Sequence, residues 1–303
     1  MFNIFEVAGR GFTLKIRNEC LLAERAGDTP VICPLTDISA ILLTEPAISL
    51  SGYLLAELGK REIPFVCCDS CYLPTSMLTG VNFAGKLDLI RHQLNLTTVS
   101  KRKLWQKIIQ SKIAGQNTVL EKWKNSSVLS GFSEIVQAGD STFVESRTAA
   151  AYWKALAVFP KREQNASDAN ILFNYGYAIL YAAVAREIAV AGLLPDLGIC
   201  HHHRDNKFNL ASDLMEPFRP CIDHVIMSIL SMEDFTDLNP QLKQNVLSKI
   251  YAIKLKYKSA WLTLFSAVRQ TVRSFVKCVQ KKQWKTLQLP NWDRDNYVDC
   301  NSF

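Results

Sequence analysis

The chain has 303 residues, of which 48% are hydrophobic and 21% charged, and its formal net charge is +7. This length suits about two ordinary domains with a sizeable core, which excludes a disordered chain and a small fold that depends on disulfides. Residues 1–85 contain more acidic than basic residues, whereas residues 239–292 contain eleven Lys and Arg and no Asp or Glu. Such a basic stretch favours a polyanionic partner, most economically nucleic acid.

The amino terminus and the cysteines predict a cytoplasmic protein. Glu6 precedes any basic residue, and no apolar run with small cleavage residues follows, so we expect no secretory signal. The longest apolar stretch, 175–185, is too short to cross a bilayer. Nine scattered cysteines are typical of reduced thiols. Cys68 and Cys71 form a C-x-x-C without a second pair, which favours a buried strand end over a zinc or redox site.

Residues 1–85 predict a β-rich domain with one inserted helix. Short runs of β-branched and aromatic residues, separated by turn-forming residues, are typical of strands. The predicted strands are 2–7, 12–16, 20–23, 38–43, 63–67 and 73–78. Residues 49–60 instead carry leucines at helical spacing behind serine caps, so they predict a helix.

Residues 86–303 predict a mostly α-helical domain with few glycines or prolines inside its elements. The predicted helices are 87–99, 103–126, 148–158, 169–192, 217–230, 240–256 and 260–282. Residues 290–303 predict a tail.

One predicted helix combines basic residues with two tryptophans. The basic residues in the predicted helix 103–126 and immediately before it are Lys101, Arg102, Lys103, Lys107, Lys112, Lys122 and Lys124. Trp105 and Trp123 lie among them. Basic side chains neutralise phosphates while an indole stacks on a base, so the helix is a candidate DNA-binding surface. A solvated face with both tryptophans in the core is the alternative, and the basic stretch after residue 239 favours DNA binding.

The densest polar cluster lies between residues 198 and 220. Three adjacent histidines, beginning at His201, precede Asp213 and Glu216. Imidazole beside carboxylates is a ligand set for Mn²⁺ or Mg²⁺, and residues three apart share one helix face. Two structural interpretations stay open: Asp213 and Glu216 also have the spacing of a helix capping box, and adjacent histidines are often simply solvated.

Several segments resemble the CRISPR-associated integrase and endonuclease family of the spacer-acquisition complex, the Cas-one family. The resemblance is strongest over residues 174–220, which end in Asp-Leu-Met-Glu-Pro-Phe-Arg-Pro. Residues 144–153, 41–52 and 73–78 match further segments of the family. Residues 103–109 and 208–212 resemble the branch that accompanies single-effector, type II systems.

The resemblance implies an α+β protein of two domains: an amino-terminal β-sandwich and a carboxy-terminal, all-α catalytic domain. It implies Glu145, His201 and Glu216 as catalytic metal ligands for Mg²⁺ or Mn²⁺, with Asp213 as a supporting acid. The family pattern Gly-x-x-His matches Gly198 and His201, although the family has one histidine where this chain has three.

The activity implied by the resemblance is CRISPR adaptation. The 3′-hydroxyl ends of a captured DNA fragment would be joined to the CRISPR repeat by transesterification, and water as the attacking group would make the protein an endonuclease. The implied partners are double-stranded DNA, a second copy of the chain in a homodimer, a small ferredoxin-like Cas-two protein in a heterohexamer, and the type II effector nuclease. The alternative is a catalytically silent DNA-binding scaffold.

Three arginines near the predicted ligands are candidates for binding the reacting phosphate, namely Arg147, Arg204 and Arg219. Arg219 has an equally good alternative, because Asp223 lies four residues on and would pair with it on a helix. Tyrosines at 152, 175 and 177 either contact DNA or pack internally, and the sequence does not separate these interpretations.

Overall fold

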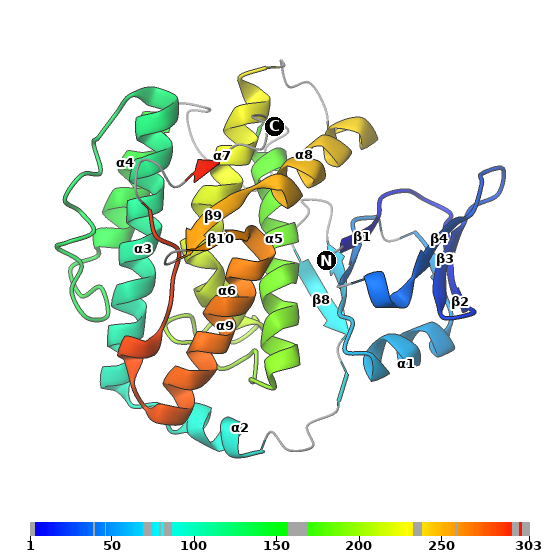
Figure 1. The fold of residues 1–303 in the computed structure, drawn as a ribbon, viewed down its shortest axis with the longest axis horizontal. Helices are drawn as coiled ribbons and strands as arrows, with labels where there is room; N and C mark the ends of the chain where they lie inside the picture. Colours follow the sequence, from blue (N-terminus) through cyan, green and yellow to red (C-terminus); the bar gives the residue numbers. More distant parts are fainter. Residues whose placement is uncertain are drawn as a thin grey trace.

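The computed structural model describes residues 4–38, 40–45, 47–68, 74–78, 80–81, 87–156, 169–232, 238–257, 260–292 and 297–298. A strand-rich amino-terminal part lies beside a larger helical part (Figure 1). The predicted α+β fold class is confirmed. The predicted domain boundary, between residues 85 and 86, falls outside the described residues.

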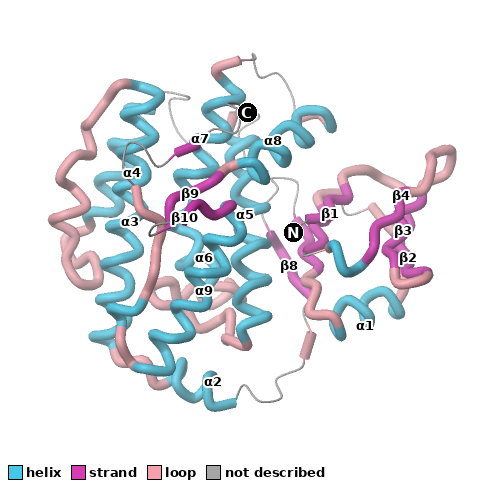
Figure 2. The backbone as a smooth tube through the Cα atoms, viewed as in Figure 1, coloured by secondary structure: helices cyan, strands magenta, loops and turns pink. Residues whose placement is uncertain are grey.

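The strands described in the amino-terminal part form two sheets, accompanied by a short 3₁₀ helix, η1 (Leu35–Asp37), and by one α-helix. Figure 2 shows these strands in magenta. The first sheet has the order β1 (Ile4–Val7), β5 (Ala40–Leu43), β7 (Phe65–Cys68) and β8 (Pro74–Leu78), in which only β8 is antiparallel to its neighbour. The second has the order β4 (Val31–Pro34), β3 (Cys20–Glu24), β2 (Thr13–Arg17) and β6 (Ser49–Leu50). Helix α1 (Gly52–Lys60) begins where Ser51 Oγ accepts a hydrogen bond from the Leu54 amide.

Strand β4 was not predicted, and its composition explains why. Pro30 precedes the strand and Pro34 is its last residue, and the strand exposes Val31 and Ile32 at the edge of its sheet. Proline is confined to edges and strand ends because it cannot donate to the ladder. A short strand between prolines therefore resembles a loop in sequence.

The first sheet joins the two parts of the molecule because its two faces belong to different cores. Ile41, Leu43 and Phe65 pack in the amino-terminal core. Leu42 and Val66, at alternate positions of the same strands, pack in the helical core. Helix α5 lies against β5 and β8 on this second face.

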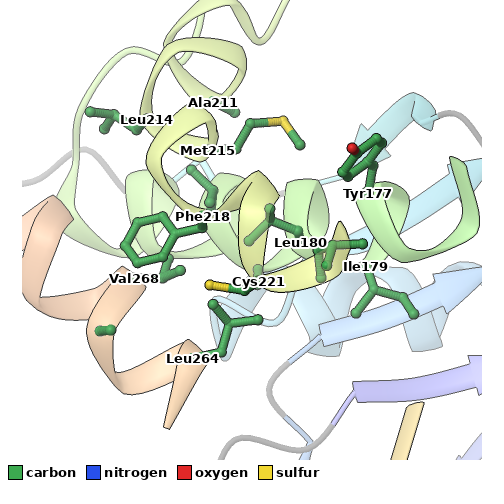
Figure 3. Packing of buried hydrophobic residues seen from close by; sticks show 14 of the residues in the cluster. Tyr177, Ile179, Leu180, Ala211, Leu214, Met215, Phe218, Cys221, Leu264 and Val268 are labelled. Atoms are coloured by element: carbon green, nitrogen blue, oxygen red, sulfur yellow. The ribbon is translucent and has the colours of Figure 1, made fainter. Parts of the chain in front are cut away.

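The helical part is built around α5 (Asn170–Ala191), which is apolar on nearly all sides, as expected of a buried helix. The surrounding elements are α2 (Leu87–Leu94), α3 (Thr98–Lys124), α4 (Val144–Leu156), α6 (Asn209–Met215), the 3₁₀ helix η2 (Glu216–Phe218), α7 (Arg219–Leu230), α8 (Pro240–Ala252) and α9 (Leu264–Lys281). Figure 3 shows Leu180 of α5 packed near Phe218 and Cys221, with Leu264 and Val268 of α9 beside them.

Helix ends differ from the predictions at identifiable residues. The predicted helix 87–99 is interrupted after α2, and α3 begins where Thr97 Oγ1 accepts from the Ser100 amide at 3.2 Å. Helix α4 begins at Val144, four residues earlier than predicted, which places Glu145 in its first turn. The predicted helix 217–230 is confirmed as η2 followed by α7.

The helical part also contains a small sheet, so its predicted all-α character is incomplete. Strands β9 (Lys254–Tyr257) and β10 (Ala260–Thr263) form an antiparallel pair, and β11 (Tyr297–Val298) adds to β9. The predicted helices 240–256 and 260–282 overran into these strands. Leu255 and Tyr257 are buried and alternate with lysines, which is the period of two that is typical of a strand. Over only four residues this period is hard to distinguish from a helical pattern.

Residues 284–292 lie along α3, where Trp292 anchors the start of the predicted tail 290–303. Of the remainder of this tail, the structure describes only residues 297–298. Lys107 Nζ donates to the Leu287 carbonyl at 2.7 Å, and Trp292 Nε1 donates to Ser111 Oγ at 3.2 Å. A Cβ on Gly115 would come within 2.7 Å of the Trp292 ring and 2.8 Å of Pro220. The close contact between Trp292 and α3 therefore requires glycine at position 115.

The described cysteines are all free thiols. Cys71 of the C-x-x-C lies outside the described residues, and so does Leu73, at the start of a predicted strand.

No helix in the described ranges is both long and apolar enough to cross a membrane. The cytoplasmic location stays a prediction.

Candidate active site

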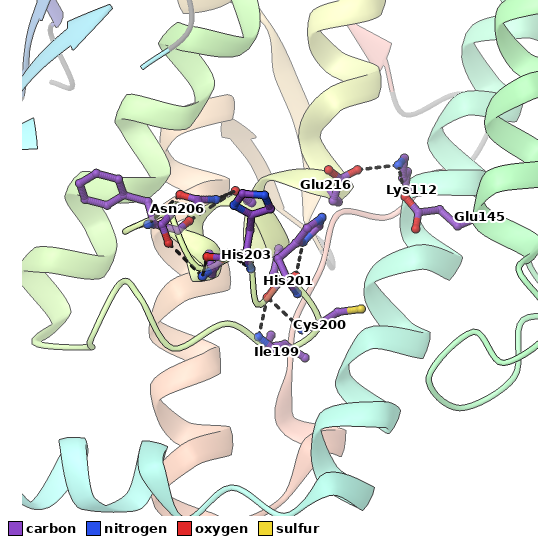
Figure 4. A network of polar contacts seen from close by, with 12 residues as sticks. Lys112, Glu145, Ile199, Cys200, His201, His203, Asn206 and Glu216 are labelled. Carbon is purple, nitrogen blue, oxygen red and sulfur yellow. Dashed lines mark hydrogen bonds and ion pairs between the residues drawn. The ribbon is translucent and has the colours of Figure 1, made fainter. Parts of the chain in front are cut away.

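Two glutamates from different elements meet at one buried lysine. Lys112 Nζ of α3 lies 2.7 Å from Glu145 Oε1 of α4 and 2.6 Å from Glu216 Oε2 of η2 (Figure 4). On the other side of Glu216, Arg219 Nε donates to Oε1 at 2.8 Å. Two predicted metal ligands, 71 residues apart in sequence, are thus brought together through a shared cation.

The position of Glu145 is fixed by the start of its helix. Asp140 Oδ1 accepts from the Val144 amide at 2.8 Å, and Asp140 Oδ2 accepts from the Glu145 amide at 3.0 Å. Val144 and Thr148 are buried and anchor the first turn. A carboxylate that satisfies two amides at a helix start holds this turn in place.

Asp213 organises the loop that carries the histidines. Its fully buried carboxylate accepts from the amides of Ile199, Cys200 and His201 and from His201 Nδ1 at 2.6 Å. Asp213 lies inside α6 and caps no helix start, so the capping-box interpretation is wrong. Asp213 and Glu216 also do not turn to one common point, because both Asp213 oxygens face the loop. Asp213 is therefore a positioning residue.

The loop needs glycine at position 198. A Cβ there would lie 2.1 Å from the His201 carbonyl oxygen and 2.9 Å from Asp213 Oδ2. Glycine allows the backbone to fold tightly onto the Asp213 carboxylate. The Gly-x-x-His spacing thus has a physical reason in this chain.

His201 is the histidine directed towards the two glutamates. Asp213 holds its Nδ1, which leaves Nε2 as the nitrogen available to a ligand. Trp105 packs edge-on against the ring, with centroids 5.6 Å apart. The hydrogen bond to Asp213 raises the pKa of His201, burial opposes this, and Glu216 and Glu145 also raise it. His202 and His203 are exposed, and the His203 amide donates to Asn209.

The site is deeply buried at Glu216 and opens towards Glu145 and His201. The side chains of Glu216 and Lys112 are 6% and 9% exposed, against 30% for Glu145 and 44% for His201. Burial alone would raise the pKa of Glu216, but the charges of Arg219 and Lys112 lower it to about 2. Burial alone would lower the pKa of Lys112, but Glu216 and Glu145 raise it. Both members of this pair are therefore charged at neutral pH.

The donor set fits a divalent metal, but Lys112 stands between the donors. Two carboxylates and one imidazole suit Mn²⁺, and with further oxygen ligands Mg²⁺. In the part of the chain that the structure describes, no three His, Cys, Asp or Glu side chains gather closely enough to hold an ion. A metal at Glu145, His201 and Glu216 would require the ammonium group to move.

The predicted phosphate-binding residues fall into two groups. Arg147, Arg204 and Arg102 are exposed, whereas Lys101 and Lys103 are half-buried. Lys103 Nζ lies 5.8 Å from the centroid of the Trp284 ring.

Arg219 pairs with a carboxylate, as the structural alternative predicted, but with Glu216 rather than Asp223. The Arg219 guanidinium also lies 4.6 Å from the centroid of the Tyr177 ring. Asp223 instead accepts from Tyr152 and Tyr177. Tyr175 donates to Glu6, so the three tyrosines hydrogen-bond inside the protein.

From the sequence, Lys112 was predicted only as one of the basic residues of a helix. Its position in the helix could have indicated a buried lysine, because Lys112 falls on the apolar stripe formed by Trp105, Ile108 and Ile109. A lysine on an apolar stripe requires a buried counter-charge. The tryptophans follow the core alternative: Trp105 is buried, and Trp123 donates to the buried His224 at 2.9 Å.

Comparison with known proteins gives a consistent result. A family model described as "CRISPR associated protein Cas1" matches residues 6–255. A CRISPR-associated endonuclease Cas1 from Neisseria meningitidis serogroup C (strain 8013) is 30% identical over 287 residues, which cover 92% of this chain and 93% of the relative.

Among solved structures, a casposase bound to an integration product is similar, with a TM-score of 0.79 and 19% identity over 93% of this chain and 91% of the casposase chain. A chain of a Cas6-RT-Cas1–Cas2 complex gives a TM-score of 0.81 at 18% identity, and the match covers 95% of this chain and 36% of that one. At these identities the two structures establish the fold.

Proposed function

Because the chain belongs to the CRISPR-associated Cas1 family, we propose that it is a divalent-metal-dependent DNA integrase and endonuclease of CRISPR adaptation. It joins the 3′-hydroxyl ends of a captured DNA fragment to the CRISPR repeat by transesterification. The observation that carries the proposal is the meeting of Glu145 and Glu216 at Lys112, with the His201 ring on the same side (Figure 4). The name of the Neisseria relative and the casposase with its integration product support it.

Glu145, Glu216 and the Nε2 of His201 would hold Mg²⁺ or Mn²⁺. When bound, such an ion lowers the pKa of the attacking hydroxyl and polarises the phosphoryl oxygen. Asp213 keeps the His201 ring in one tautomer and orientation, and Trp105 packs on its edge. Arg219 holds the buried Glu216 ionised. The protein supplies no covalent nucleophile in this scheme.

The solvent-facing side of the site is where DNA enters, because Glu145 and His201 are the exposed members. Arg147 is exposed two residues after Glu145, and Arg204 is exposed three residues after His201. We assign both to the phosphate backbone near the reacting group, where they stabilise developing charge. Arg102, with Lys101 and Lys103, extends this basic surface along α3 and binds DNA of any sequence.

The proposed partners are double-stranded DNA, a second copy of this chain, and a small Cas2-type protein in a heterohexamer. The Cas6-RT-Cas1–Cas2 complex, of which a similar chain is part, supports the Cas2-type partner. The exposed edge strand β4, with Val31 and Ile32, supports pairing through the amino-terminal part. We also propose the type II branch, with its effector nuclease as a further partner.

The test is an integration assay with the purified protein, with and without its Cas2-type partner, on a supercoiled plasmid that carries a repeat. We expect Mn²⁺- or Mg²⁺-dependent joining of fragments with 3′-hydroxyl ends and none with 3′-deoxy ends. DNA binding without joining or nicking in either metal would contradict the proposal and favour the silent scaffold.

A further inference from the structure

We propose that Lys112 is the resident counter-cation of the active site and that a divalent ion binds there by displacing its ammonium group. This inference rests on the proposed metal-dependent function. It adds that Lys112 occupies the position between the two glutamates in the metal-free site, and that the cost of displacing it lowers the affinity for the ion.

Geometry makes the lysine and the metal exclusive. Lys112 Nζ lies within 2.7 Å of one oxygen from each glutamate. Mg²⁺ binds carboxylate oxygens at about 2.0–2.1 Å. An ion that bonds both of these oxygens would therefore occupy the space now filled by the ammonium group.

Charge leads to the same conclusion. The two glutamates are balanced by two cations, Lys112 and Arg219, and Glu216 and Lys112 are almost completely buried. Adding a divalent ion while both cations stay in place would leave excess positive charge in a poorly solvated region. Removing the ammonium from between the acids restores most of the balance.

Lys112 rather than Arg219 is the cation that yields. Lys112 bridges both acids and would be replaced by an ion that bridges them equally well. Arg219 donates to Glu216 and also lies over the Tyr177 ring. A lysine ammonium is a point charge on a flexible stem, whereas arginine is held by its planar fork and its stacking. Arg219 can thus keep one Glu216 oxygen while the other changes partner.

The test measures Mn²⁺ binding to the full chain without DNA, by the loss of the free-ion electron paramagnetic resonance signal. Lys112→Met retains the length of the side chain and removes its charge. We expect the Kd for Mn²⁺ to fall by about tenfold or more, and the melting temperature to rise more with added Mn²⁺ than in the wild type. Lys154→Met, at an exposed lysine of α4, is the matched control and leaves the Kd unchanged.

Lys112→Gln guards against misfolding of the methionine variant, because its amide can hydrogen-bond to the glutamates without carrying charge. An unchanged or weaker Mn²⁺ affinity in the folded Lys112 variants would overturn the inference, since it would mean that Lys112 supports the metal ligands. Glu145→Gln distinguishes the metal site from the displacement of Lys112. If Glu145→Gln weakens Mn²⁺ binding and the Lys112 variants do not tighten it, the metal site stands and only the displacement of Lys112 is wrong. If the wild type binds no Mn²⁺ that depends on Glu145, the proposed metal site fails as well.

Discussion

The strand-rich and helical parts of the molecule bury different kinds of side chain. Among the described residues of the strand-rich part, only Thr44 and Glu57 are buried polar groups. The helical part buries Lys112, Asp213, Glu216, Asp223 and His224, together with several amides and hydroxyls. Burying charge is costly unless each group is paired. In the helical part, Lys112, Asp213 and Glu216 are paired at the candidate site, whereas Asp223 and His224 hydrogen-bond to Tyr152, Tyr177 and Trp123 outside it. The described strand-rich part is built mainly for packing.

The largest expected effect comes from Glu216→Ala. The change leaves the buried Lys112 with Glu145 alone and removes the carboxylate that Arg219 contacts, so we expect the free energy of unfolding to fall by about 3–5 kcal/mol. Joining activity should fall at least about 100-fold. Chemical denaturation and the integration assay measure these effects.

Glu57→Ala is the matched change in the strand-rich part, where the partners Lys60 and Arg61 reach solvent. It should keep full joining activity and lose less stability than Glu216→Ala. Equal losses of stability in Glu57→Ala and Glu216→Ala would contradict the claim that buried charge costs more in the helical part than in the strand-rich part.

Asp213→Asn tests whether a buried acid positions the site without binding the ion. The variant loses the carboxylate charge and one of the two acceptor oxygens that hold the loop amides and His201 Nδ1, so the ring is fixed less firmly and joining should fall by about 10- to 100-fold. The pKa of His201, followed by NMR, should fall from its raised value towards or below the ordinary range. An unchanged His201 pKa would show that Asp213 does not act through this ring.

Gly115→Ala tests the contact of residues 284–292 with α3. The added methyl overlaps Trp292 and Pro220, so we expect a loss of about 1–3 kcal/mol in thermal or chemical unfolding. Gly52→Ala in α1 is the control, because its Cβ meets nothing within 4 Å. Trp292→Leu should recover part of the loss, and full additivity of the two changes would contradict the contact.

The smallest expected effect lies where the two parts meet. Glu6 of β1 accepts from Thr44 and from Tyr175 of α5, and burial raises its pKa, while Tyr175, Thr44 and Lys243 oppose the rise. Its contribution to stability is therefore greatest below the unfolded pKa and is lost as pH rises through the folded value. The stability of Glu6→Gln relative to the wild type should increase as the pH rises above the ordinary carboxyl pKa of 4.5, because only the wild type must ionise a carboxyl group whose pKa is raised in the folded state. A difference that stays constant as the pH rises would contradict the shift.

Local sequence patterns predicted much of the fold because they are set by neighbouring residues. The strands around Leu42 and Val66 and the apolar helix α5 followed from composition and period. Strand β4 and the sheet after residue 253 were missed, since short strands near prolines or lysines carry little periodic signal.

The candidate site was predicted in part. Residue types and spacing indicated the histidines with Asp213 and Glu216, the resemblance added Glu145 and selected His201, and the structure brings these residues into one region (Figure 4). The partnership of Lys112 with both glutamates depends on packing between α3, α4 and η2, which no local pattern encodes. The role of Asp213 was not predicted, because the three amides that it binds lie more than ten residues earlier in the chain. Its spacing to Glu216 suggested a metal ligand or a helix cap instead.

The most direct test of the central claim is single-turnover joining of DNA with a 3′-hydroxyl end to a repeat plasmid in Mn²⁺. It compares Glu145→Ala, His201→Ala and the double variant Glu145→Ala/Glu216→Ala with the wild type. If these residues form one catalytic unit, each single variant loses joining by at least about 100-fold and the double variant loses little more than either. Wild-type joining by a folded single variant would contradict the claim that this cluster performs the chemistry.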